Sequence, residues 1–303
     1  MQTIIITGGR TLQGAICPET AKNSVLPLLA ASLLCQGTVR LRAVPRLADV
    51  ETSIALLRAV GAGVQRCGSE LLLCAEKPLC GQIPAPLSGA MRSSVFYLAP
   101  LLCRTGSVRL PLPGGCRLGP RPVDIHLAGL AALGAAVELE GDAVTLRAPG
   151  GLHGADFALR LPSVGATLTL MMAACCAVGT TVLRGAACEP EVADTARFLS
   201  QCGAQIQGAG TPTLVIQGAE ALHGTAYTPM PDRIAAATYA AALACAGGEV
   251  SIARCRPAYY AAFLSFLQRC GVEIFFSSDS VTLRRDPAVP LRGAQSLCAN
   301  AWP

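Results

Sequence analysis

Three basic residues stand at the beginnings of Ala/Leu-rich segments that we expect to form helices: Lys22, Arg92 and Arg233. A helix N-terminus already presents free N–H donors and the positive end of the helix dipole, so a cation there is unfavourable for the helix itself. We infer that Lys22 and Arg92 face a bound anion. For Arg233, a solvated or carboxylate-paired side chain is the preferred interpretation. The fourth such segment begins at Ser163–Ala166, whose backbone N–H groups could bind a phosphate.

A loop rich in glycine and proline, residues 110–126, contains Cys116 with arginines close by in the sequence, among them Arg121. Neighbouring guanidinium groups lower the pKa of a thiol, which prepares it to act as an acid or a nucleophile. The composition of the loop suits a lid that closes over a reactant. A loop cysteine without a chemical role is the alternative that these residues alone leave open.

Two further groups of polar residues have a structural interpretation. His126 ends the loop. Either it orients Asp124 or a ligand, or its role is only structural. The acidic group Glu189-Pro190-Glu191 with Asp194 is typical of a helix start, where it would cap the helix.

The segments that carry these residues belong to a repeat of about seventy residues. Each repeat is predicted to run from an apolar helix through a strand and a second helix to a β-hairpin, which makes it an α/β unit with right-handed crossovers. The strand of each repeat opens with a glycine, at positions 37, 106, 179 and 248, so the spacings are 69, 73 and 69 residues. The predicted first helices are Ser24–Cys35, Ser93–Cys103, Ala166–Val178 and Ile234–Ala246.

The number of repeats predicts two domains. Three units, residues 22–229, would close into one domain that carries the Cys116 loop. Residues 1–21 plus 230–303 would form an incomplete second domain, in which the fourth unit pairs with an N-terminal strand, Thr3–Thr7.

The composition excludes several classes of protein. The net charge of +5 is spread without basic runs, which disfavours nucleic-acid binding and suits a small anionic substrate. The longest apolar stretch, Ile234–Gly247, is shorter than the roughly 20 residues of a membrane span. No export signal is visible, so we expect a cytoplasmic protein. The 15 cysteines include no C-x-x-C pair, which argues against zinc, and we expect nearly all of them, Cys175, Cys176 and Cys245 included, to be small buried hydrophobes.

In combination, these motifs resemble those of the UDP-N-acetylglucosamine 1-carboxyvinyltransferase family of enolpyruvyl transferases. The matching motifs follow one another in family order: Ala21-Lys22-Asn23, Met91-Arg92-Ser93-Ser94, Pro113-Gly114-Gly115-Cys116, Gly119-Pro120-Arg121-Pro122-Val123-Asp124, Pro162-Ser163-Val164-Gly165-Ala166-Thr167, Glu189-Pro190-Glu191 and Pro231-Asp232-Arg233-Ile234. The resemblance implies an inside-out α/β barrel of six such units, of which this sequence shows four. A separate C-terminal fragment with two more units is therefore an expected partner.

The resemblance also implies a reaction, the transfer of the enolpyruvyl group of phosphoenolpyruvate to the 3-hydroxyl of UDP-N-acetylglucosamine with release of phosphate. This reaction is the first committed step of peptidoglycan synthesis, and it implies no metal and no organic cofactor. Cys116 would be the general acid or covalent carrier. The residues implied for phosphoenolpyruvate are Lys22, Arg92 and Arg121, and those implied for the UDP-sugar are Asn23, Arg121, Pro122, Val123, Asp124, Ser163, Val164 and Gly165.

Three alternatives stay open at this point. The chain could be a UDP-sugar-binding relic that does not turn over, or an enzyme like 5-enolpyruvylshikimate-3-phosphate synthase, which shares the chemistry and lacks the cysteine loop. An α/β repeat scaffold for protein partners is the most remote of the three.

Overall fold

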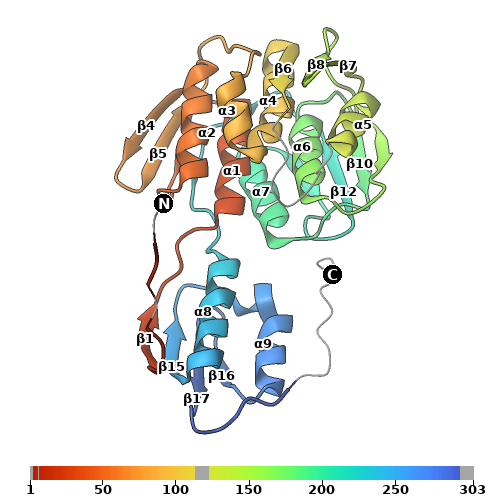
Figure 1. Cartoon of the computed structure of the whole chain (residues 1–303). Helices are drawn as coiled ribbons and strands as arrows, with labels where there is room; N and C mark the ends of the chain where they lie inside the picture. Colours follow the sequence, from red (N-terminus) through yellow and green to blue (C-terminus); the bar gives the residue numbers. More distant parts are fainter. Residues whose placement is uncertain (1–2, 6, 113–122, 294–303) are drawn as a thin grey trace. The chain divides into compact units, whose positions relative to one another are not determined.

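The computed structural model describes residues 3–5, 7–112 and 123–293. They form two compact units (Figure 1). The larger unit comprises Lys22–Met230, and the smaller comprises the residues up to Ala21 together with those from Pro231 onward. Each unit has a hydrophobic core of its own.

The larger unit contains three copies of the predicted repeat. The first copy holds α1 (Lys22–Ala31), η1 (Ser32–Leu34), β2 (Cys35–Gln36), β3 (Thr38–Leu41), α2 (Ala48–Ala59), β4 (Gly63–Cys67) and β5 (Glu70–Cys74). The second holds α3 (Ala85–Ala90), η2 (Arg92–Tyr97), α4 (Leu98–Thr105), β6 (Ser107–Pro111), α5 (Asp124–Ala132), β7 (Ala136–Glu140) and β8 (Ala143–Arg147). The third holds β9 (Asp156–Ala158), α6 (Val164–Ala174), β10 (Thr180–Arg184), α7 (Pro190–Gln201), β11 (Gln205–Gln207) and β12 (Thr213–Gln217), followed by β13 (Leu222–His223) and β14 (Ala226–Tyr227).

Helices occupy the interior of the larger unit. From Ser24 to Ala31 every residue of α1 is buried, and the same holds for α6 from Ala166 to Ala174. A helix that is apolar on all sides must be enclosed on all sides, and η2, α4, α1 and α6 accordingly pack against one another. The strands lie outside them, with one face toward the helices, as the alternating burial of β5 and β10 indicates. This arrangement confirms the predicted architecture of α/β repeats with their helices inside.

All four predicted first helices are present, and each begins one or two residues earlier than predicted, at Lys22, Arg92, Val164 and Arg233. The second of them opens as the 3₁₀ turn η2 before it continues as α4. The basic residues therefore lie within the first helical turn.

Among the described residues, the two four-stranded sheets of the larger unit share one strand order, and an edge strand closes this unit; the sheet of the second repeat, β6-β8-β7, has three strands. In the sheet β9-β10-β12-β11, β10 follows α6 and pairs in parallel with β9, which precedes α6. The hairpin of β11 and β12 completes the sheet. In the first repeat, the parallel edge strand is β14, which follows the third repeat. The end of the larger unit thus pairs with its beginning, in register Ala226↔Arg40 and Tyr227↔Leu41.

The smaller unit is a single repeat with an added strand. It consists of α8 (Arg233–Ala246), β15 (Gly248–Ile252), η3 (Pro257–Tyr260), α9 (Ala261–Arg269), β16 (Glu273–Phe276) and β17 (Val281–Arg285). Its sheet has the order β1-β15-β17-β16, and β1 (Leu12–Ile16) pairs in parallel with β15.

The expected N-terminal partner strand, Thr3–Thr7, was wrong in position. The described residues of that segment form no strand, and the pairing residues are Leu12–Ile16. The repeat explains the difference. In the third repeat, the edge strand ends at Ala158 and the helix begins six residues later at Val164; Ile16 stands in the same relation to Lys22. The β-branched residues of the earlier segment favour a strand locally, but the connection to the next helix fixes where the edge strand lies.

The expectation that nearly all cysteines are buried was too broad. Cys17, Cys67, Cys80 and Cys245 are exposed, whereas Cys175 is buried and Cys176 is half-buried. Cys245 lies in an apolar run, but that run forms α8, one face of which is exposed. Within the described residues, no helix is both long enough and apolar enough to cross a membrane.

Candidate functional site

Lys22 begins α1, and its charge is paired. Its Nζ lies 2.9 Å from Oδ2 of Asp49 in the first turn of α2, and both side chains are about half exposed. The structure therefore gives Lys22 a carboxylate partner where the sequence predicted a bound anion. A partly exposed ion pair contributes only about 0–1 kcal/mol. The ammonium group is thus held at the helix start by an interaction that a bound anion could share or replace.

Below this surface pair, a buried polar cluster joins the first and third repeats. Ser24 Oγ donates a hydrogen bond to Asp194 of α7. The Asp194 carboxylate also accepts from the hydroxyl of Tyr227 at 2.7 Å and from the backbone N–H of Met230 at 3.1 Å, and it pairs with Arg197 at 2.9 Å. The prediction that Asp194 caps its own helix was wrong. Its side chain points inward and ties α1 and the end of β14 to α7.

Arg92, at the start of η2, is close enough to His126 to influence its pKa. His126 lies on α5 and is buried, with Nδ1 3.0 Å from Oγ1 of Thr169. Burial and the nearby Arg92 guanidinium lower the pKa of His126 to about 4, although Asp124 acts in the opposite direction. His126 is therefore neutral near pH 7, and it adds no second cation beside Arg92.

Asp124 and the start of α6 also lie near this histidine. Asp124 begins α5 and pairs with Arg160 at 2.5 Å. Ser163 caps α6, its Oγ accepting from the N–H of Ala166 at 3.3 Å. Gly165 lies against the imidazole, since a Cβ at this position would stand 3.1 Å from Cε1 and Nε2 of His126. The absence of a side chain at Gly165 lets α5 and α6 approach each other here.

The structure thus brings several predicted residues together in the larger unit. Arg92, Asp124 and Gly165 lie near His126, and Ser163 and Val164 form the adjoining start of α6. Lys22 and the exposed Asn23 lie at the start of α1, a helix that packs on η2. Val123 immediately precedes α5.

The remaining predicted residues are not part of this group. Cys116, Arg121 and Pro122 lie outside the described residues. Arg233 is in the smaller unit, where Asp232 caps α8 by accepting from the N–H groups of Ile234 and Ala235 at 2.8 and 3.0 Å.

Sequence reasoning missed three polar residues beside the predicted ones: Asp49, Arg160 and Thr169. For two of them, the sequence contained an indication of a position near the site. Asp49 is the first acid of a predicted helix in the repeat that begins with Lys22, and Arg160 stands three residues before Ser163. Thr169 had none, because a threonine in the middle of an apolar helix is usually a packing residue.

The arrangement of these residues suits the binding of an anion. Two helix starts in the larger unit carry a cation, Lys22 and Arg92, and a third, that of α6, has N–H donors in its first turn. Such a surface can hold carboxylate and phosphate groups while developing charge is stabilised during a reaction. Among the described side chains, no group of three or more His, Cys, Asp or Glu residues is close enough together to hold a metal ion.

Comparison with known proteins gives a consistent picture. Residues 6–297 match the family model of EPSP synthase (3-phosphoshikimate 1-carboxyvinyltransferase). UDP-N-acetylglucosamine 1-carboxyvinyltransferase from Caulobacter sp. (strain K31) is 44% identical over 290 residues, which are 94% of this chain and 67% of that protein. The enolpyruvyl transferase NikO from Streptomyces tendae superposes with a TM-score of 0.80 at 26% identity, over 94% of this chain and 68% of that one. EPSP synthase from Acinetobacter baumannii has the same fold, with a TM-score of 0.71 at 16% identity over 91% of this chain and 66% of that one.

Proposed function

Because the chain belongs to the EPSP synthase (3-phosphoshikimate 1-carboxyvinyltransferase) family, we propose that it transfers the enolpyruvyl group of phosphoenolpyruvate to the 3-hydroxyl of UDP-N-acetylglucosamine and releases phosphate. The observation that carries this choice of acceptor is the 44% identity to a protein named UDP-N-acetylglucosamine 1-carboxyvinyltransferase. The reaction would serve peptidoglycan synthesis in the cytoplasm, and through it cell-wall growth, cell shape and division.

The proposed roles follow the chemistry of the reactants. Lys22, Arg92 and Arg121 would hold phosphoenolpyruvate, whose carboxylate and phosphate need cations. The start of α6, Ser163–Gly165, would present N–H groups to the diphosphate, and residues 121–124 would contact the uridine diphosphate moiety. Asn23 would bind the sugar. Cys116 would protonate the methylene carbon of phosphoenolpyruvate or carry the group covalently.

The ion pairs of the site are compatible with these roles. In the absence of reactants, the cation of Lys22 is offset by Asp49. A dianion approaching the start of α1 gains the attraction of the ammonium group and gives up a pair worth only about 0–1 kcal/mol. Neutral His126 keeps Thr169 in place without competing with Arg92 for the anion.

Phosphate release by the full chain tests the proposal. We expect release that requires both phosphoenolpyruvate and UDP-N-acetylglucosamine, and that is lost in Cys116→Ser but retained in the matched control Cys67→Ser, which alters an exposed thiol of a hairpin. Release with shikimate 3-phosphate in place of the UDP-sugar would favour the acceptor of the family's namesake. Absence of release with either acceptor would contradict a catalytic role and leave binding of the UDP-sugar, measured by calorimetry, as the remaining function.

Substitution of Lys22 tests the anion site separately. Loss of a charge-assisted hydrogen bond to a reactant costs about 1.5–3 kcal/mol, so Lys22→Gln should lower kcat/KM for phosphoenolpyruvate by about ten- to a hundredfold. Arg58→Gln, at the exposed end of α2, is the control and should leave it unchanged.

A further inference from the structure

At the opposite ends of the inner helices, the larger unit gathers cysteines. Cys103 and Cys176 each stand three residues before the strand glycine of their repeat (103 to 106 and 176 to 179), and Cys35 stands two before its own (35 to 37). Equivalent positions of neighbouring repeats lie together in a closed array. The repeat therefore brings thiols from three separate parts of the chain to one place.

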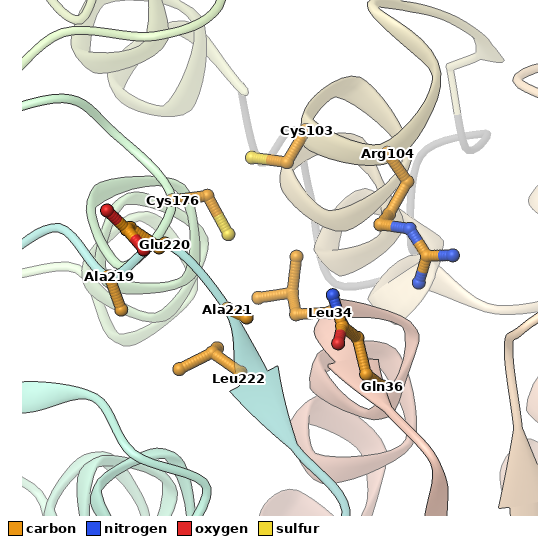
Figure 2. A pocket seen from close by; sticks show the side chains of 9 residues that line it. All are labelled: Leu34, Gln36, Cys103, Arg104, Cys176, Ala219, Glu220, Ala221 and Leu222. Atoms are coloured by element: carbon orange, nitrogen blue, oxygen red, sulfur yellow. The ribbon is translucent and has the colours of Figure 1, made fainter.

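A pocket of about 280 Å³ opens at this place. Its lining comes from η1 and β2 at the end of the first inner helix, from the end of α4, from the residues just after α6, and from the segment that leads into β13. Figure 2 shows the side chains of Cys103 and Cys176 on its wall, with Arg104 reaching in from α4. Both cysteines are half-buried, whereas Cys35, Cys175 and Cys202 are buried. A small molecule in the pocket can therefore meet the first two thiols only.

The two thiols are unequal partners in one hydrogen bond. That bond raises the pKa of Cys103 and lowers the pKa of Cys176, and the Arg104 guanidinium lowers the pKa of Cys176 further. Arg104 is fixed beside the pocket, because its Nη1 donates to the carbonyl of Leu33 at 2.5 Å and its Nη2 to that of Ala75 at 2.6 Å. Helix C-termini disfavour a thiolate, and burial also raises the pKa of Cys176. The hydrogen bond with Cys103 and then the Arg104 cation oppose both effects, and the net direction is a lowered pKa.

From this geometry we propose that Cys176 and Cys103 are the attacking and resolving thiols of a redox-sensitive site that reacts with small-molecule disulfides. The Cys176 thiolate attacks one sulfur of the reagent, whose S–S bond breaks and releases a thiolate. Cys103 then loses its proton and attacks the Cys176 sulfur, and the second thiolate of the reagent leaves. The protein thiols lose two electrons to the reagent, and the two reagent thiolates take up the two protons that the protein thiols gave up. The product is a Cys103–Cys176 disulfide that ties the end of α4 to the second residue after α6.

The site is distinct from the proposed reaction site. Arg92 begins the helical segment that ends near Cys103, and Ser163 caps the helix after which Cys176 follows. The 11 residues of α6 separate the two ends by about 17 Å at a rise of 1.5 Å per residue. A Cys103–Cys176 disulfide uses neither Arg92 nor the start of α6, so the two sites can be tested apart.

Peptide mapping of the full chain tests the proposal. The reduced protein is incubated with glutathione disulfide, blocked with N-ethylmaleimide and cleaved with trypsin. Cleavage after arginine places Cys103 in peptide 93–104, and Cys175 with Cys176 in peptide 161–184. We expect these two peptides to appear as a linked pair that dithiothreitol separates. Failure of the pair to form, while the exposed Cys80 or Cys245 acquires glutathione, would overturn the proposal.

Variants assign the two roles. Cys103→Ser should abolish the linked pair and trap glutathione on peptide 161–184, because the resolving thiol is gone. Cys175→Ser should keep the pair, and both Cys176→Ser and Cys176→Ala should lose it; a pair that persists in both would assign the reaction to Cys175 and refute the proposal. Cys245→Ser is the matched control, because this exposed cysteine also stands three residues before the strand glycine of its repeat. It should form the pair as the wild type does.

Discussion

Helices α6 and α8 occupy the same place in their repeats and are almost equally rich in apolar residues, yet their surroundings differ. In the larger unit, α6 is enclosed by η2, α4, α5 and α7, and its residues from Ala166 to Ala174 are buried. In the smaller unit, α8 packs on α9 and on the sheet, and Ile234 and Tyr239 stay 51% and 45% exposed. The apolar composition of such a helix therefore predicts that it can be enclosed, and the number of sister repeats in the unit decides whether it is.

The substitution with the largest expected effect removes the contacts that join the first and third repeats of the larger unit. Asp194→Ala leaves the hydroxyl of Ser24 and the N–H of Met230 without their acceptor, and Arg197 without its carboxylate. The hydroxyl of Tyr227 loses its bond to the carboxylate and keeps only the one to the backbone carbonyl of residue 194. We expect the larger unit to lose about 3–5 kcal/mol, as when one partner of a buried polar pair is removed. Hydrogen exchange measured by mass spectrometry reports the stability of the two units separately. Protection should fall in Lys22–Met230 and persist in β15 and β17, and equal loss in both units would contradict a role confined to the larger one.

A pair of substitutions compares the two helices directly. Leu170 of α6 is fully buried, and it packs so closely on Gly129 that a Cβ there would stand 2.3 Å from its Cδ1. Leu170→Ala should cost about 3–4 kcal/mol, because the surroundings cannot close the cavity. Ile234→Ala, on the exposed face of α8, should change stability by less than about 0.5 kcal/mol. The same exchange measurement checks both, and a comparable cost at Ile234 would mean that the face of α8 is covered.

The dependence of stability on pH tests His126, which lies near the starts of η2 and α6. The pKa of His126 is about 4 in the folded chain, below the ordinary value of 6.5, so protonation favours the unfolded state. The stability that neutral His126 contributes is complete above pH 6.5 and is lost as the pH falls toward 4, to an extent on the order of 3 kcal/mol. Urea unfolding followed by circular dichroism should show a shallower acid loss in His126→Gln.

The smallest expected effect concerns exposed ion pairs, which should behave alike in both units. Arg160–Asp124 in the larger unit and Arg284–Glu249 in the smaller have N···O distances of 2.5 and 2.7 Å, and all four side chains are about half exposed. Arg160→Ala and Arg284→Ala should each cost less than about 0.5 kcal/mol. Thermal denaturation in low and high salt checks this. A clearly larger loss for Arg160→Ala would indicate that the pair supports the start of α5.

The repeat made most of the fold predictable from the sequence. Glycine spacing and apolar helices located the repeats, because each glycine ends one element and opens the next. The edge strand β1 was misplaced, because its position follows from the six-residue connection to α1 and from its pairing with β15, and not from the β-branched residues that precede it. Of the site, the helix-start cations were visible in the sequence. The pairing of Lys22 with Asp49 and the inward turn of Asp194 were not, because both depend on which helix packs beside which.

The pairing of β1 with β15 has a consequence for the order of synthesis. Leu12 of β1 leaves the ribosome 236 residues before its partner Gly248 (248 − 12). Domains generally fold as units in the order in which they are made. The continuous segment Lys22–Met230 can complete its own pairing, β14 on β3, while β1 still waits for a neighbour. During translation, β1 is therefore paired only after the whole of Lys22–Met230 has been made, and until then a nascent-chain chaperone could shield its unpaired backbone.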